Sequence, residues 1–97
     1  MTIDDIAEKI QSRLVGFNHT LKLDFEEEGM LFVDAVQNPP VVTKDDMDAE
    51  VTLRTSLDTF EKILNGTQDP NMAFMMGKLK VSGSMGLALK LNGMLES

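Results

Sequence analysis

Apolar and polar side chains alternate along residues 19–27, which predicts a half-buried β-strand. An acidic turn that ends at Gly29 leads into residues 30–37, where both faces are apolar except at Asp34. Glycine suits this turn because it adopts backbone angles that other residues resist. The two segments therefore predict an antiparallel hairpin whose second strand lies nearer the centre of a sheet.

Apolar residues recur at helical spacing in two further segments. Residues 2–14 open with Thr2 and Asp5, which resemble a capping box with Asp in place of the usual Glu. Ser56 is a good N-cap for the second segment, and Gly66 is a suitable stop. Both segments are predicted to be helices with one apolar face turned toward a core.

Three short segments complete the expected sheet. Residues 41–43 follow two consecutive prolines and predict a short edge strand, because proline cannot donate to a β-ladder. Residues 49–54 alternate and predict a strand with one apolar face. Leu79 and Val81 are expected to point inward from a third strand, between lysines that point outward.

The apolar pattern is densest in residues 69–91. A short helix is expected here, with Asp69 as its cap and Pro70 at its first position, and it carries a run of Met, Ala and Phe. The final segment, residues 84–92, is apolar on nearly every side of the helix that it predicts. A helix without a polar face is either covered by protein or lines a site for an apolar ligand.

Composition indicates one globular domain that spans residues 1–97. The chain has 42% hydrophobic and 26% charged residues, with eight Met and no Tyr or Trp. Methionine is flexible and polarizable, so a methionine cluster either fills gaps in a core or adapts to ligands of different shape. The sequence leaves both interpretations open for the cluster, which is Met72, Met75, Met76 and Met85.

The net charge of −7 argues against a nucleic-acid partner, because such proteins normally present a basic face. Charge is unevenly distributed, since residues 70–95 contain Lys78, Lys80 and Lys90 but no acid. These lysines either attract an anion such as a lipid headgroup or belong to an ordinary solvated strand edge.

Candidate chemistry is sparse. The chain has no Cys and one His, His19, so neither a metal site nor a nucleophilic triad is indicated, and no cofactor is expected. His19 and Asp34 are interpreted as structural residues, and the protein is expected not to be an enzyme. The N-terminal segment fits neither a signal nor a transit peptide, and no membrane span is indicated, so a cytoplasmic location is expected.

Residues 70–91 resemble the sterol carrier protein, or non-specific lipid-transfer, domain family. The family pattern is a Pro-containing helical turn with an Ala-Phe pair, then Gly-Lys-Leu-Lys, a β-branched residue, a turn with Gly, and Met-Gly-Leu-Ala before Lys-Leu. The matching residues are Pro70, Ala73, Phe74, Gly77, Lys78, Leu79, Lys80, Val81, Gly83, Met85, Gly86, Leu87, Ala88, Lys90 and Leu91.

This resemblance implies an α+β fold with a curved, mainly antiparallel sheet of about five strands and helices on one face. It also implies non-catalytic binding or carriage of a fatty acid, fatty acyl-CoA or related lipid in an apolar tunnel between sheet and helices. The residues expected to line the tunnel are Phe32, Val51, Phe60, Leu64, Met72, Phe74, Met75, Met76, Met85, Leu87, Leu89 and Leu91. The residues expected near a headgroup are Lys78, Lys80 and Lys90.

The expected partner is therefore a small lipid, with at most transient membrane contact and a possible homodimer. The ending Leu95, Glu96 and Ser97 does not match the Ser-Lys-Leu-type peroxisomal signal. Because few residues follow Leu91, an acyl chain is expected rather than a sterol. Two alternatives remain open. One is an interaction module that uses the apolar last helix, and the other is an enzyme or an accessory domain that presents acyl groups to one.

Overall fold

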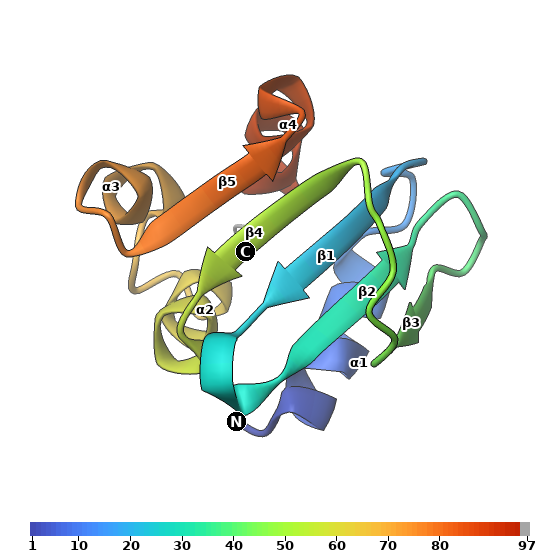
Figure 1. Cartoon of the computed structure of the whole chain (residues 1–97), viewed down its shortest axis with the longest axis horizontal. Coiled ribbons are helices and arrows are strands. Elements are labelled where there is room, and N and C mark those ends of the chain that lie inside the picture. The colour runs from blue at the N-terminus through green and yellow to red at the C-terminus, as the bar shows by residue number, and fades with distance from the viewer. Residues whose placement is uncertain (96–97) are drawn as a thin grey trace.

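Five strands form a single sheet in the computed structural model, which describes residues 1–95 (Figure 1). The strand order is β3-β2-β1-β4-β5, with β1 and β4 parallel and the other three neighbouring pairs antiparallel. The strands are β1 (Thr20–Asp24), β2 (Met30–Asp34), β3 (Val41–Thr43), β4 (Val51–Thr55) and β5 (Leu79–Gly83). The expected mainly antiparallel α+β fold is confirmed. Glu96 and Ser97, to which the comparison with a peroxisomal signal refers, lie outside the described residues.

The helices gather on one side of the sheet and at its β5 edge. They are α1 (Ile3–Arg13), α2 (Leu57–Leu64), α3 (Pro70–Met75) and α4 (Met85–Leu95), and a short 3₁₀ turn, η1 (Glu26–Glu28), joins β1 to β2. In Figure 1, α1 and α2 lie behind the sheet, while α3 and α4 flank β5. Contacts link α3 to β5, and α4 to α1, β4 and β5.

The predicted helix starts are confirmed by their hydrogen bonds. The Asp5 backbone N–H donates to Thr2 Oγ1 at 3.2 Å, and the Thr2 N–H donates to Asp5 Oδ2 at 3.0 Å, which completes a capping box. Ser56 Oγ accepts from the Thr59 backbone N–H at 3.1 Å. Asp69 caps α3, and Pro70 occupies its first turn.

The core lies between the sheet and the helices, where alternate strand residues face α1, α2 and α4. Strand register places Leu21 opposite Val33, beside Val51, on this inner face. Phe25 packs edge-on against Phe60 of α2, with the ring centres 5.5 Å apart. Polar and charged residues occupy most of the intervening strand positions, and the exceptions are Met30 and Phe32 of β2 and Val41 of β3.

The opposite face of the sheet is covered in part by the segment that links β3 to β4. This segment crosses in front of β1 and β2 in Figure 1, and Lys22 Nζ of β1 lies 2.7 Å from Asp46 Oδ1 within it. Phe32 pairs with Lys22 across β1 and β2, so it shares this outer face, and it is 7% exposed. Phe32 is therefore buried on the side away from the helices, and it cannot line a space between sheet and helices.

Strand β2 ends three residues earlier than the apolar pattern suggests. The Asp34 carboxylate accepts hydrogen bonds from the Val36 backbone N–H at 3.2 Å and from Gln37 Nε2 at 3.3 Å. These local bonds hold the chain in a turn, which competes with continued strand pairing. Asp34 thus has a structural position at the end of the strand.

Candidate functional site

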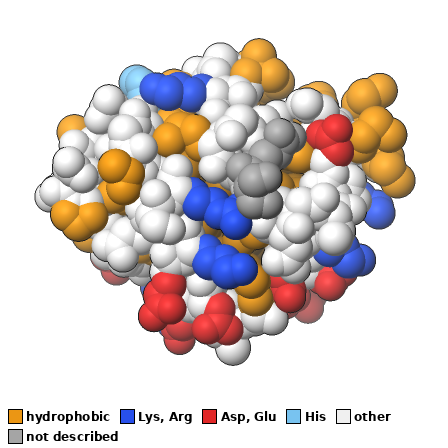
Figure 2. Space-filling view, turned by 180° about the vertical axis from the view of Figure 1, so that it is seen from behind, with side chains coloured by type: hydrophobic (Ala, Val, Ile, Leu, Met, Phe, Trp, Pro, Cys, Tyr) orange, Lys and Arg blue, Asp and Glu red, His pale blue; other side chains and the backbone are white. Residues whose placement is uncertain are grey.

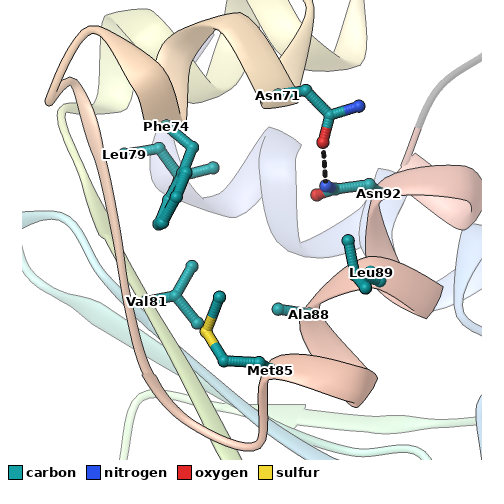
Figure 3. Close-up of a pocket in the computed structure, with 8 residues that line it drawn as sticks. All are labelled: Asn71, Phe74, Leu79, Val81, Met85, Ala88, Leu89 and Asn92. Carbon is teal, nitrogen blue, oxygen red and sulfur yellow. Dashed lines mark hydrogen bonds between the residues drawn. The ribbon is translucent and has the colours of Figure 1, made fainter.

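A pocket of about 70 Å³ opens between α3, β5 and α4 (Figure 3). Six of its eight lining side chains are apolar, and the other two are asparagines. The lining residues are Asn71, Phe74, Leu79, Val81, Met85, Ala88, Leu89 and Asn92. The pocket therefore offers a small apolar space with a neutral polar end.

Strand alternation in β5 and helical spacing in α4 explain why these side chains face the same pocket. Leu79 and Val81 alternate along β5 and both face the pocket, because every second strand residue points to the same side. On α4, Met85, Leu89 and Asn92 follow each other at helical spacing and form a stripe along one face. The wall on the α3 side comes from Phe74.

The two asparagines meet at one end of the pocket. Asn92 Nδ2 donates a hydrogen bond to Asn71 Oδ1 at 2.9 Å, which links α4 to α3. Figure 3 shows this bond at the upper end of the site, above Ala88 and Leu89. The bond is exposed, so water competes for both of its partners and it can open at modest cost.

Large apolar side chains are exposed on α3, at its C-terminal end and on α4, the two helices that border the pocket. We call this surface the apolar rim: Met72, Phe74, Met75, Met76, Met85 and Leu89. Met75 is 77% exposed and Leu89 is 66% exposed. In Figure 2, hydrophobic side chains gather over α3 at the upper right and over α4 at the top. Several large exposed apolar side chains on two neighbouring helices are typical of a ligand- or partner-binding site.

The structure divides the twelve expected tunnel residues among different environments. Phe74, Met85 and Leu89 line the pocket. Met72, Met75 and Met76 belong to the apolar rim but not to the pocket wall. Leu87 is partly buried against the core. The fully buried core residues are Val51, Phe60, Leu64 and Leu91, and Phe32 lies on the outer face of the sheet.

The three lysines do not approach the pocket as a group. Lys80 pairs with Arg54 on the outer face of the sheet, between the inward-facing Leu79 and Val81. Lys90 Nζ instead donates a hydrogen bond to the Phe17 carbonyl oxygen at 3.2 Å. Lys78 is exposed just before β5 and is not a lining residue.

Several site residues lack a distinctive sequence signal. The alternation predicts that Leu79 and Val81 point inward, and helical spacing puts Ala88 on an apolar face, but neither shows that these residues share a pocket. Asn92 is one of the few polar positions in an apolar helix, which is a weak signal for a special role. Asn71 has no such signal in the sequence. Its role depends on a contact with Asn92, which lies on another helix beyond an intervening strand.

A polar cluster lies where β1 and β4 begin. The Thr20 backbone N–H donates to Glu50 Oε2 at 2.9 Å, and His19 Nδ1 lies 3.2 Å from the same oxygen. The Thr20 hydrogen bond, with a smaller effect of His19, lowers the pKa of the Glu50 carboxyl below its ordinary value. Neither His19 nor Glu50 lines the pocket.

Residues 1–95 contain neither a metal-binding cluster nor a helix that could span a membrane. No group of three or more His, Cys, Asp or Glu side chains in this range is placed to hold a metal ion. No helix within it has the length and apolar character needed to cross a membrane.

Comparison with known proteins identifies the family. Residues 3–96 match the model of the SCP-2 sterol transfer family. The chain belongs to this family. Solved structures of related proteins agree with this assignment at the level of the fold, and the resemblance seen in residues 70–91 is confirmed.

Two solved SCP-2 structures superpose over nearly the whole chain. Sterol Carrier Protein-2 from Aedes aegypti, solved by NMR in complex with the C16 fatty acid palmitate, has a TM-score of 0.79 at 23% identity, covering 98% of this chain and 96% of that chain. Apo Sterol Carrier Protein 2 from Yarrowia lipolytica has a TM-score of 0.72 at 24% identity, covering 96% of this chain and 78% of that chain.

A longer curated protein also contains an SCP-2-like region. Hydroxysteroid dehydrogenase-like protein 2 from Xenopus laevis is 41% identical over 75 residues, which are 75% of this chain and 18% of that protein. The chain thus spans less than a fifth of the length of this relative.

Proposed function

We propose that this protein binds and carries a lipid through its alkyl chain, without catalysing a reaction on it. The observation that carries the proposal is the apolar pocket between α3, β5 and α4, which opens into the apolar rim. Each methylene moved from water into such a site contributes about 0.8 kcal/mol, so an alkyl chain needs no charged partner to bind.

The lipid enters by separating α3 from α4. The pocket of about 70 Å³ is well below the roughly 300 Å³ at which pockets for small ligands begin, so it holds only part of an alkyl chain in this conformation. One exposed hydrogen bond, from Asn92 to Asn71, links the two helices at the pocket. Gly86 and Gly93 lower the helical preference of α4, which favours its movement.

The complex of the Aedes aegypti protein with palmitate supports an alkyl-chain ligand by analogy of fold. Fatty acids and fatty acyl esters are therefore the first compounds to test. The domain holds lipid either alone or as part of a larger protein, and the dehydrogenase-like relative contains a region similar to it.

The direct experiment is displacement of a fluorescent fatty acid from the purified protein. We expect saturable binding with a dissociation constant on the order of micromolar, and weaker binding in Leu89→Gln, whose side chain lines the pocket. Met47→Gln is the matched control, because Met47 is a half-exposed residue that is not part of the pocket lining. Absence of saturable binding by the wild-type protein would refute the proposal.

The exposure of the apolar rim favours a second candidate, in which α3 and α4 dock on another copy of the chain. Light scattering before and after removal of lipid separates the two functions. A dimer that persists without lipid and dissociates in Met75→Gln would support docking, whereas a monomer in both states would exclude it.

A further inference from the structure

We infer that the polar end of the pocket selects lipids with an uncharged, hydrogen-bonding head, such as a long-chain alcohol, over lipids with an ionised carboxylate. The inference rests on the proposed function, because it concerns which lipid the same pocket prefers. It is carried by the Asn71–Asn92 pair and by the positions of the charges around it.

The asparagine pair can both donate and accept hydrogen bonds. Asn92 Nδ2 already donates to Asn71 Oδ1, which leaves the Asn92 carbonyl oxygen and the Asn71 N–H groups without a side-chain or backbone partner in residues 1–95. If both amides turn over, the two residues exchange roles and the pair still presents one donor group and one acceptor. A hydroxyl group satisfies both, whereas a carboxylate accepts hydrogen bonds only.

Within residues 1–95, no positively charged side chain lines the pocket. The eight lining residues include no Lys, Arg or His. Lys90 is hydrogen-bonded to the Phe17 carbonyl oxygen, and Lys80 lies on the outer face of the sheet opposite Arg54. Lys80 and Lys90 are thus directed elsewhere, and Lys78 is exposed and does not line the pocket.

An acid, in contrast, lies beside the backbone of Asn71. Asp69 Oδ1 accepts a hydrogen bond from the Asn71 backbone N–H at 2.9 Å. A carboxylate head held by the Asn71 side chain would therefore lie close to a like charge, which disfavours its binding, most strongly at low ionic strength. Donor, acceptor and charge together favour an uncharged head with an O–H group.

The experiment compares hexadecanol, hexadecyl methyl ether and palmitate, at a pH where palmitate is ionised, by displacement of one fluorescent probe. These ligands share an alkyl chain but differ in whether the head donates, only accepts, or is charged. We expect hexadecanol to bind about tenfold more tightly than palmitate, and the ether to have an intermediate affinity. A tenfold difference in affinity corresponds to the contribution of one or two hydrogen bonds.

Two variants assign the preference to this end of the pocket. Asn92→Leu preserves side-chain size and is expected to reduce the difference in affinity between hexadecanol and the ether, because it leaves one amide where there were two. Asn65→Leu, at an exposed asparagine at the end of α2, is the control and should leave the ranking unchanged. Asp69→Asn keeps a good helix cap and is expected to improve palmitate binding about twofold at low salt without changing hexadecanol.

The outcomes separate the inference from the proposed function. If the wild-type protein binds palmitate as tightly as hexadecanol, or if Asn92→Leu leaves the difference between hexadecanol and the ether unchanged, the inference is overturned while lipid binding stands. If none of the three ligands displaces the probe, or the probe itself does not bind, both fail. Circular dichroism of each variant tests whether the fold is retained. If Asn92→Leu is unfolded, the effect of Asp69→Asn on palmitate binding still tests the inference.

Discussion

Lys90 Nζ donates a hydrogen bond to the carbonyl oxygen of Phe17 at 3.2 Å, and it lies 5.6 Å from the centre of the Phe17 ring. The contact joins α4 to the segment between α1 and β1. Lys90 and Phe17 are 73 residues apart in sequence. The contact also explains why Lys90, although it lies in the middle of α4, is not directed into the pocket. Lys90 therefore helps to hold α4 on the domain.

We expect Lys90→Met to lower the free energy of unfolding by about 1 kcal/mol, since it removes one hydrogen bond and one cation–π contact. Urea unfolding at constant pH measures this change. Lys80→Met is the control and should have almost no effect or a small stabilising one, because Lys80 faces Arg54 across the β4–β5 pair. Equal destabilisation by the two substitutions would contradict the structural role of Lys90.

Two glycines in the C-terminal region should respond to alanine in opposite directions. Gly83 has a φ of +87°, and a Cβ atom added to it would lie 2.5 Å from the Glu50 carbonyl oxygen. Gly83→Ala is therefore expected to destabilise the domain by at least about 2 kcal/mol. Gly93 lies within α4 with no atom near an added Cβ, so Gly93→Ala should stabilise by about 0.5–1 kcal/mol.

Thermal unfolding followed by circular dichroism compares these two variants. If α4 must move to admit a lipid, Gly93→Ala should also slow the association of a fluorescent fatty acid, because a stiffer helix opens less often. A stabilised variant with an unchanged association rate would show that α4 opens as a rigid body.

The pocket itself can be filled from its wall. Ala88 is buried and lines the pocket, so in Ala88→Leu the added carbons extend into open space. We expect a change of less than about 1 kcal/mol in stability, together with several-fold weaker binding of a fluorescent fatty acid. Both are measured on the same preparation, by urea unfolding and by probe titration.

Ala73→Leu provides the contrast, because Ala73 is buried in the core on α3 and is not a lining residue. Overpacking there should cost about 1–3 kcal/mol. If Ala88→Leu were as destabilising as Ala73→Leu, the space beside Ala88 would not be an accessible pocket.

Glu50 should make stability depend on pH in the acid range. Its hydrogen bond from Thr20 and its contact with His19 lower the pKa in the folded state, so the unfolded chain binds a proton first as pH falls. The stabilisation is fully present above the ordinary pKa near 4.5, and it is lost as pH falls through the lower pKa of the folded state. We expect Glu50→Gln to be less stable than wild type near neutral pH and to approach it in acid.

Urea unfolding at a series of pH values tests this expectation. Asp58→Asn is a suitable comparison, because the Asp58 carboxylate is exposed and forms an ion pair with Lys62, four residues along α2. A gap between wild type and Glu50→Gln that stays constant through the acid range would contradict the proposed contribution of Glu50.

Local sequence determined most of the secondary structure and part of the site. Alternation and helical spacing act over a few residues, so they correctly predicted the strands, the caps at Thr2, Ser56 and Asp69, and the inward direction of Leu79 and Val81. The pattern of residues 70–91 also indicated the family. The apolar last helix left two explanations open, burial or contact with an apolar ligand.

The tertiary structure decided which explanation applies to which side of that helix. Leu91 packs into the core, whereas Leu89 remains exposed beside a pocket, because only one face of α4 lies against the sheet and α1. Long-range contacts also direct Lys90 toward Phe17 and bring Asn71 to Asn92, and the segment between β3 and β4 lies over the face of the sheet where Phe32 is buried. Such contacts depend on how elements pack together, so the spacing of residues along the chain carries no signal for them.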